Sequence, residues 1–245
     1  MPNDHPTNLD LARPRSVLEI LATALRLYAS HPLLFVLLAL IVVAPYDLIV
    51  LGAAHAAPLG QQTTSAGTAL LLTLIEFAIV GPFVSALQVQ AVLMIGEGHR
   101  PTLADVLAQS VRILPVVVAA EIIAGIGIGI GLILFILPGV ILALRWAVVA
   151  QAAAVERTDW PSALRRSAAL TSRNYLRIFA LLFIVSLIVL AIVDGIGQAA
   201  GTSTSAPHVV LGIAIATITR SFQALTTAVL YFDLRARESS LLRTA

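Results

Sequence analysis

Six long apolar runs follow one another along this chain, separated by short polar segments. Each run approaches the length of about 20 residues that an α-helix needs to cross the hydrocarbon core of a bilayer. The pattern predicts membrane spans at residues 33–51, 69–95, 113–136, 140–155, 176–196 and 208–232. The predicted fold class is therefore all-α: a polytopic bundle of six transmembrane helices in one domain, residues 15–238, with tails at 1–14 and 239–245.

The third and fourth spans come from a single apolar stretch, which charge interrupts only at Glu121 and Arg145. The stretch is too long for one crossing. Proline and glycine are the strongest markers of a turn, and Leu137-Pro138-Gly139 lies near its middle. We therefore expect the chain to reverse direction at these three residues.

A short amphipathic segment precedes each odd-numbered span. The first begins with Ser16 and Glu19, which have the spacing of a capping box, and the second begins with Thr102 and Asp105. The third starts near Asp159, in a context that suits the start of a helix. Basic amphipathic helices of this kind lie in the membrane interface, so the sequence predicts three interfacial helices.

The order of interfacial helix, span, turn and span thus occurs three times, always in one orientation. Leu21 and Arg26 of the first amphipathic segment match Leu107 and Arg112 of the second in register. Parallel repeats of this type are related by an axis along the membrane normal, which predicts a threefold arrangement of hairpins. The alternative is that any membrane protein built from hairpins looks similar by chance.

Charge orients the bundle. All 15 basic residues are arginine, and most flank the inner ends of the spans, whereas the connections at 52–67, 137–139 and 197–207 carry no charge. By the positive-inside rule, both termini are cytoplasmic in a multi-pass protein of the inner (plasma) membrane of a bacterium. Only 11% of residues are charged, against about 25% in soluble domains. The expected partners are membrane lipids and other membrane proteins, and not nucleic acid.

Motifs for chemistry are missing from the sequence. The chain has no cysteine, which excludes disulfides and thiolate sites, and its five histidines have no metal-ligand spacing. No Walker or nucleophile-elbow motif occurs. We therefore expect no catalytic residue, no metal and no cofactor. Four glycines that alternate with isoleucine have the small-x-x-x-small spacing of close helix packing; they are Gly125, Gly127, Gly129 and Gly131.

Four ionisable residues lie deep within the predicted spans. A charge at mid-membrane costs about 2.5–3.5 kcal/mol, so each should face the protein interior and find a partner. Depths counted at about 1.5 Å per residue predict the pairs Glu76–Arg145 and Glu121–Arg220. The pairs either form a polar site for an anionic or zwitterionic ligand or only fix helix packing. Asp47 and Asp194, nearer the outer ends, are expected to be interface carboxylates.

Four further arginines are candidates for contact with lipid headgroups. Arg165 and Arg166 lie in the third amphipathic segment, and Arg235 and Arg237 follow the last span. Arginine near a span end pairs with lipid phosphates. The alternative is that these residues only anchor the topology.

Two stretches resemble a known family. They are LPGVILALRW at 137–146, followed by Glu156 and SALRRSAAL at 162–170, and LYFDLRARE at 230–238. They are similar to the membrane domain of glycerophosphoryl diester phosphodiesterase and to related bacterial six-span proteins. The resemblance implies six spans with cytoplasmic termini and a role in phospholipid metabolism. It does not imply the diesterase activity, because no motif of the catalytic domain occurs. Gln151 stands where many relatives have proline, which predicts a straighter fourth span.

Two functions follow from these observations. The first is a non-catalytic integral membrane protein that binds or helps to move phospholipid, or that supports an envelope complex. The alternative is a small-solute or ion-coupled transporter that uses the buried Glu/Arg site. An enzyme is disfavoured, because no nucleophile–base or metal constellation is present.

Overall fold

The computed structural model describes residues 13–55, 65–200 and 206–244, and within these ranges the chain forms helices and no strand. The helices are α1 (Val17–Ser30), α2 (Pro32–His55), α3 (Ala66–Ile75), the π-helical η1 (Glu76–Val80), α4 (Gly81–Gly96), α5 (Leu103–Leu134), α6 (Ile136–Arg145), α7 (Val149–Glu156), α8 (Trp160–Thr171), α9 (Tyr175–Ala200) and α10 (Ala206–Thr244).

Six helical segments are long and apolar enough to cross a membrane, which confirms the predicted fold class. They are Pro32–Ala53, Ala66–Gly96, Leu103–Leu134, Ile136–Glu156, Tyr175–Gly195 and Ala206–Ser240. Their outer faces are rich in exposed leucine and isoleucine, such as Leu176 at 87% exposed and Ile133 at 86%. Exposed apolar surface on this scale suits a lipid solvent.

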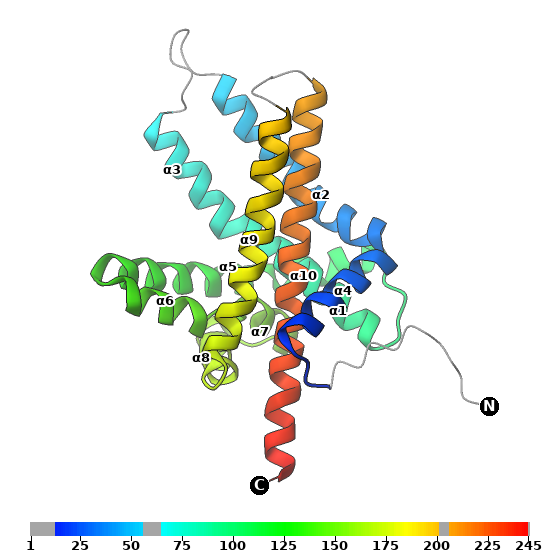
Figure 1. Ribbon diagram of the computed structural model, residues 1–245, viewed down its shortest axis with the longest axis vertical. Coiled ribbons are helices and arrows are strands. Elements are labelled where there is room, and N and C mark those ends of the chain that lie inside the picture. Colours follow the sequence, from blue (N-terminus) through cyan, green and yellow to red (C-terminus); the bar gives the residue numbers. More distant parts are fainter. Residues whose placement is uncertain (1–12, 56–64, 201–205, 245) are drawn as a thin grey trace, which may run out of the picture.

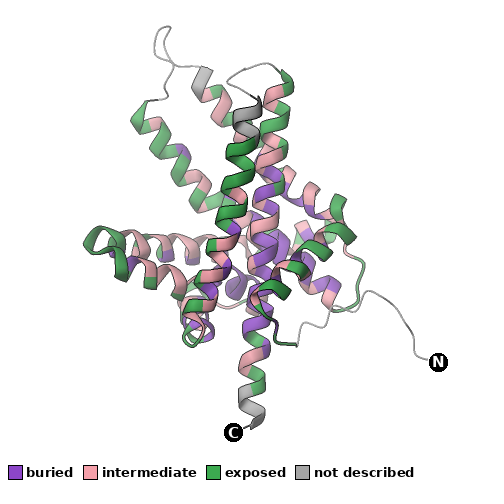
Figure 2. Ribbon diagram, in the orientation of Figure 1, coloured by how far each residue is buried: buried purple, intermediate pink, exposed green. Residues whose placement is uncertain are grey.

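Three helical hairpins diverge from a shared base (Figure 1). The facing ends of α2 and α3, and those of α9 and α10, lie toward the top of the view, whereas the α5–α6 turn extends to the left. The buried residues concentrate at the base, where α4, α7 and the middle of α10 meet (Figure 2). The chain thus forms three hairpins, and the α5–α6 turn lies apart from the facing ends of the other two.

The amphipathic helices differ among the three units. The first has the predicted capping box, in which the Ser16 hydroxyl accepts from the Glu19 N–H and the Glu19 carboxyl accepts from the Ser16 N–H. The bond from the Ser16 backbone N–H, and after it the bond from the Ser16 side chain, lowers the pKa of the Glu19 carboxyl. In the second, the Thr102 side chain caps the helix as expected, but the amphipathic segment continues directly into the span as α5. The third is the separate helix α8. Only the second unit therefore lacks a break between its amphipathic helix and its span.

The turn between the third and fourth spans lies earlier than predicted. The extended residue is Phe135, with φ −158° and ψ 140°, and α6 begins at Ile136. Leu137-Pro138-Gly139 therefore lies within the first turn of α6. Proline is tolerated there, because the first N–H groups of a helix have no intrahelical acceptor.

Glycines set the distance between α5 and α6. A Cβ atom on Gly131 would lie 2.9 Å from the Gly139 Cα, and one on Gly139 would lie 2.6 Å from the Leu132 nitrogen. Cβ atoms on Gly125 and Gly127 would overlap the rings of Phe77 and Trp146, whereas Gly129 meets nothing within 4 Å. The predicted packing role is confirmed for three of the four alternating glycines.

Alanine at these positions is expected to have opposite effects. Gly139→Ala places a methyl group against helix backbone and is expected to destabilise the fold by about 1–3 kcal/mol. Gly129→Ala, the matched control, occupies open space in a helix and is expected to stabilise by about 0.5–1 kcal/mol. Thermal unfolding in detergent measures both. Equal midpoints for the two variants would contradict the close approach of α5 and α6.

The fourth span is broken rather than straight. α6 ends at Arg145 and α7 begins at Val149, so the expectation drawn from Gln151 is wrong. The hydroxyl groups of Ser167 and Thr171 on α8 donate to the Arg145 carbonyl oxygen at 3.1 and 3.0 Å. These bonds satisfy a carbonyl group that lies at the end of α6, and they attach the break to α8.

Candidate functional site: a pocket between three hairpins

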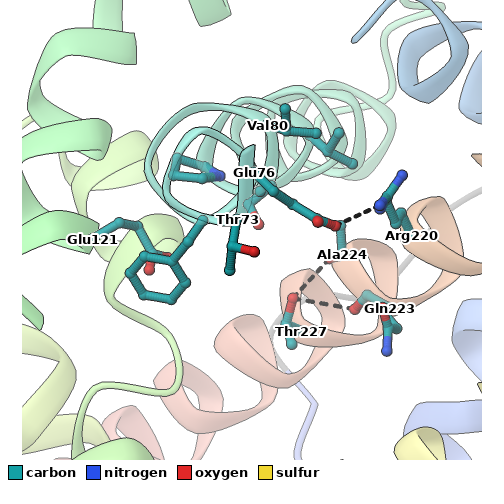
Figure 3. Close-up of a pocket in the computed structure, with 13 residues that line it drawn as sticks. Thr73, Glu76, Val80, Glu121, Arg220, Gln223, Ala224 and Thr227 are labelled. Atoms are coloured by element: carbon teal, nitrogen blue, oxygen red, sulfur yellow. Dashed lines mark hydrogen bonds and ion pairs between the residues drawn. The ribbon is translucent and has the colours of Figure 1, made fainter. Parts of the chain in front are cut away.

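One pocket of about 460 Å³ lies where the hairpins diverge. Its walls come from α3, η1 and α4 of the first hairpin, from α5 of the second, and from α10 of the third. Each hairpin contributes one charged residue: Glu76, Glu121 and Arg220 respectively. Figure 3 shows Glu76 directed toward Arg220, with Glu121 on the opposite side. Polar lining is added by Thr73, Ser85, Gln223 and Thr227.

A local irregularity in the helix positions Glu76. The backbone N–H of Gly81 donates to the Glu76 carbonyl oxygen, five residues back, which defines a π-helical turn. Pro82 follows directly; it has no N–H to donate and its ring crowds the preceding turn, so a wider turn relieves the helix. Such π-bulges occur frequently at functional sites, because they change the direction in which side chains point.

Arg220 binds two carboxylates. Its Nη1 donates to Asp47 Oδ1 at 3.1 Å, and its Nη2 donates to Glu76 Oε1. The Tyr46 hydroxyl lies 3.0 Å from the Leu72 carbonyl oxygen and 3.2 Å from Glu76 Oε2. The guanidinium carbon lies 5.7 Å from the centroid of the Tyr46 ring, within cation–π range. The cluster therefore joins α2, η1 and α10 through charge-assisted bonds.

Glu121 has no such partner. Its carboxylate makes no hydrogen bond or ion pair to any residue within 13–55, 65–200 or 206–244. One turn further along α5, a Cβ atom on Gly125 would lie 2.1 Å from the Phe77 ring. Because residues four apart share one helix face, the Phe77 ring and the Glu121 carboxylate lie on the same wall.

The predicted pairs Glu76–Arg145 and Glu121–Arg220 are therefore wrong. Arg220 bonds to Glu76 rather than to Glu121. Arg145 is exposed at the end of α6, and its side chain forms no ion pair within the described part of the chain. Asp47, predicted to be an interface carboxylate, belongs to the cluster. Depth counted from the ends of the runs failed because diverging hairpins have no common level from which to count.

A second charged cluster lies at the base of the bundle. The Asp233 side chain on α10 is fully buried. It accepts hydrogen bonds from the backbone N–H of Arg15, from Arg177 at 2.7 Å and from Arg237 at 3.1 Å. Both arginines also donate to the Arg15 carbonyl oxygen. Asp233 thereby connects the residues before α1 to α9 and α10.

A third cluster surrounds Arg166 on α8. The guanidinium binds Glu238 at 2.6 Å and Glu156 at 2.7 Å, and these carboxylates raise its pKa further above the usual range. Arg166 and Arg237 thus point at protein carboxylates. Arg165 and Arg235 are exposed, and Arg235 lies over the Tyr231 ring. Of the four predicted headgroup contacts, these two have guanidinium groups without a protein carboxylate partner among the described residues.

No group of three or more metal-binding side chains occurs among the residues that the structure describes. No protein-family model, no curated protein and no solved structure matches the chain. The geometry therefore defines a six-span helical membrane protein with a charged pocket in its bundle, and the function rests on that pocket.

Proposed function

We propose that this chain is a non-catalytic membrane protein whose intramembrane pocket binds a small solute and allows it to cross the bilayer. The main support for this proposal is that Glu76, Glu121 and Arg220, one from each hairpin, line the same pocket. A pocket of about 460 Å³ falls within the size range of small-molecule sites.

A purely structural role accounts poorly for this arrangement. In ion pairs that only fix helix packing, each buried charge has a partner of opposite charge, and no cavity is needed beside the pair. Here Arg220 is satisfied by Asp47 and Glu76, yet Glu121 remains unpaired beside the pocket. An ionised group at such depth costs about 2.5–3.5 kcal/mol on insertion scales. A binding function explains why the chain keeps this costly group, and helix packing alone does not.

The remaining expectations belong to the same proposal. The protein lies in the inner membrane with both termini in the cytoplasm, as the arginine distribution indicates. Its exposed Arg165 and Arg235 contact phospholipid headgroups at that side. The phospholipid-related role that the family resemblance implies is compatible with a solute that derives from a lipid headgroup.

Substituted cysteines test the pocket, because the natural chain contains none. Ser85→Cys, in the pocket wall, is expected to react with a water-soluble thiol reagent when the protein is in lipid nanodiscs. Leu187→Cys, on the exposed apolar face of α9, is expected to stay unreactive, because lipid covers it. In intact cells, Gly67→Cys should react with an impermeant reagent and Ser239→Cys should not.

Two results would contradict the proposal. If Ser85→Cys is as unreactive as Leu187→Cys, water does not enter the pocket and no polar solute passes through it. If Ser239→Cys reacts in intact cells and Gly67→Cys does not, the orientation is the reverse of the proposed one.

A further inference from the structure

We infer that the ligand of this pocket is a small organic cation, bound by the Glu121 carboxylate and the adjacent Phe77 ring. The inference rests on the proposed function and assigns the substrate class of the same site. Three features of the pocket support it: the balance of charge, the two carboxylate partners of Arg220, and the aromatic wall beside Glu121.

Carboxyl groups outnumber guanidinium groups in the site. Asp47, Glu76 and Glu121 are three carboxylates, and Arg220 is the one guanidinium that bonds to any of them among the described residues. The site with all four groups ionised carries two net negative charges. Electrostatic attraction is strong in the low dielectric of the bundle, so a net negative site favours a cation over an anion.

Arg220 is poorly placed to receive an anion. Each of its two terminal nitrogens donates to a different carboxylate, and Tyr46 covers its face. An anionic ligand at Arg220 would lie beside Asp47 and Glu76, whose negative charges repel it. The anionic ligand considered from sequence is therefore disfavoured.

Glu121 and Phe77 together suit an organic cation. The Gly125 backbone, without a side chain, lets the Phe77 ring lie against α5 one turn from Glu121. A carboxylate supplies the counter-charge, and an aromatic face attracts an ammonium group within about 6 Å of the ring centroid. Val80, Pro82 and Val84 add apolar wall, which suits alkyl substituents more than a hydrated metal ion.

Two thiol reagents of similar size and opposite charge test the inference at Ser85→Cys in nanodiscs. They are the methanethiosulfonates that carry a trimethylammonium-ethyl or a sulfonato-ethyl group, each normalised to its rate with 2-mercaptoethanol. The cationic reagent is expected to react about tenfold faster than the anionic one, as a nearby unpaired charge in a medium of intermediate dielectric requires. Tetraethylammonium chloride should slow the reaction more than sodium chloride at equal ionic strength does, because salt alone only screens the attraction.

Three variants in the Ser85→Cys background assign the effect to Glu121. Glu121→Gln should remove most of the preference, whereas Glu121→Asp should retain it. Glu97→Gln, an exposed carboxylate after α4, is the matched control and should change nothing.

The outcomes separate the two proposals. Equal rates for both reagents, a preference for the anionic reagent, or an unchanged preference in Glu121→Gln would overturn the cation assignment and leave the pocket as a solute site. If Ser85→Cys reacts with neither reagent, the proposed function fails as well.

Discussion

Replacing Arg220 with methionine is expected to destabilise the bundle more than any other single substitution in the pocket. The change leaves Asp47 and Glu76 facing each other without their shared guanidinium. The Arg220 and Asp47 side chains are 26% and 20% exposed, and an uncompensated charge within a membrane span costs about 2.5–3.5 kcal/mol. The measurement is the midpoint of thermal unfolding in detergent, together with the yield of monodisperse protein.

Two companion variants make this expectation specific. Neutralising all three groups, with Arg220→Gln, Asp47→Asn and Glu76→Gln together, should recover much of the loss, because no charge is then left unpaired. Arg145→Met should change the midpoint little, because that side chain is exposed and forms no ion pair among the described residues. If Arg145→Met costs as much as Arg220→Met, the pairing predicted from depth is the better description.

The sequence predicts most of the fold, because the bilayer sets a length and an apolar character that six runs meet. Caps at Ser16 and Thr102 are equally local: a hydroxyl and a carboxyl three residues apart are enough to predict the start of a helix. These features depend on neighbouring residues alone, and the structure confirms them.

Features that depend on the packing of distant segments could not be predicted in this way. The break after Arg145 is stabilised by hydroxyl groups on α8, some 20 residues further along the chain. Phe135 forms the α5–α6 turn, while Pro138, the stronger local signal, lies in the first turn of α6. Arg220 selects Asp47 and Glu76 because α2, η1 and α10 meet there, which no count of residues along one helix reveals.

One signal for the site was present and was missed. Gly81-Pro82 lies five residues after Glu76 within an apolar run, and proline inside a span requires an irregular turn. A carboxylate followed by such a turn in mid-membrane marks a candidate binding position, because broken helices place backbone and side-chain groups at a cavity. That pattern distinguishes Glu76 from Asp194, which has no proline nearby in α9.

Helix α10 connects the pocket to the base of the bundle. It carries Arg220 at the pocket, Asp233 about three and a half turns further on, and Glu238 beyond that. The same helix therefore bonds to α2 and η1 at the pocket, and to α8 and α9 at the base. The base clusters thus set the stability of the scaffold from which the three hairpins diverge.

Asp233→Asn is expected to have the second large effect. The fully buried carboxylate accepts from Arg177, from Arg237 and from the backbone before α1. Asparagine keeps the shape, but it replaces one acceptor oxygen by an amide donor and leaves two guanidinium groups without a counter-charge. The expected cost is about 3–5 kcal/mol, measured as a lower unfolding midpoint.

Glu238→Gln is the matched control for this substitution, because it removes another α10 carboxylate that binds an arginine, here Arg166 on α8. The Glu238 side chain is 39% exposed, and its partner Arg166 keeps Glu156 at 2.7 Å. Partly exposed pairs contribute about 0–1 kcal/mol, so its midpoint should stay close to that of the natural protein. Similar losses in the two variants would show that net charge at the base, rather than the buried contacts of Asp233, controls stability. A large drop in the unfolding midpoint for Asp233→Asn alone would establish that the Asp233 bonds to the residues before α1, to α9 and within α10 stabilise the bundle.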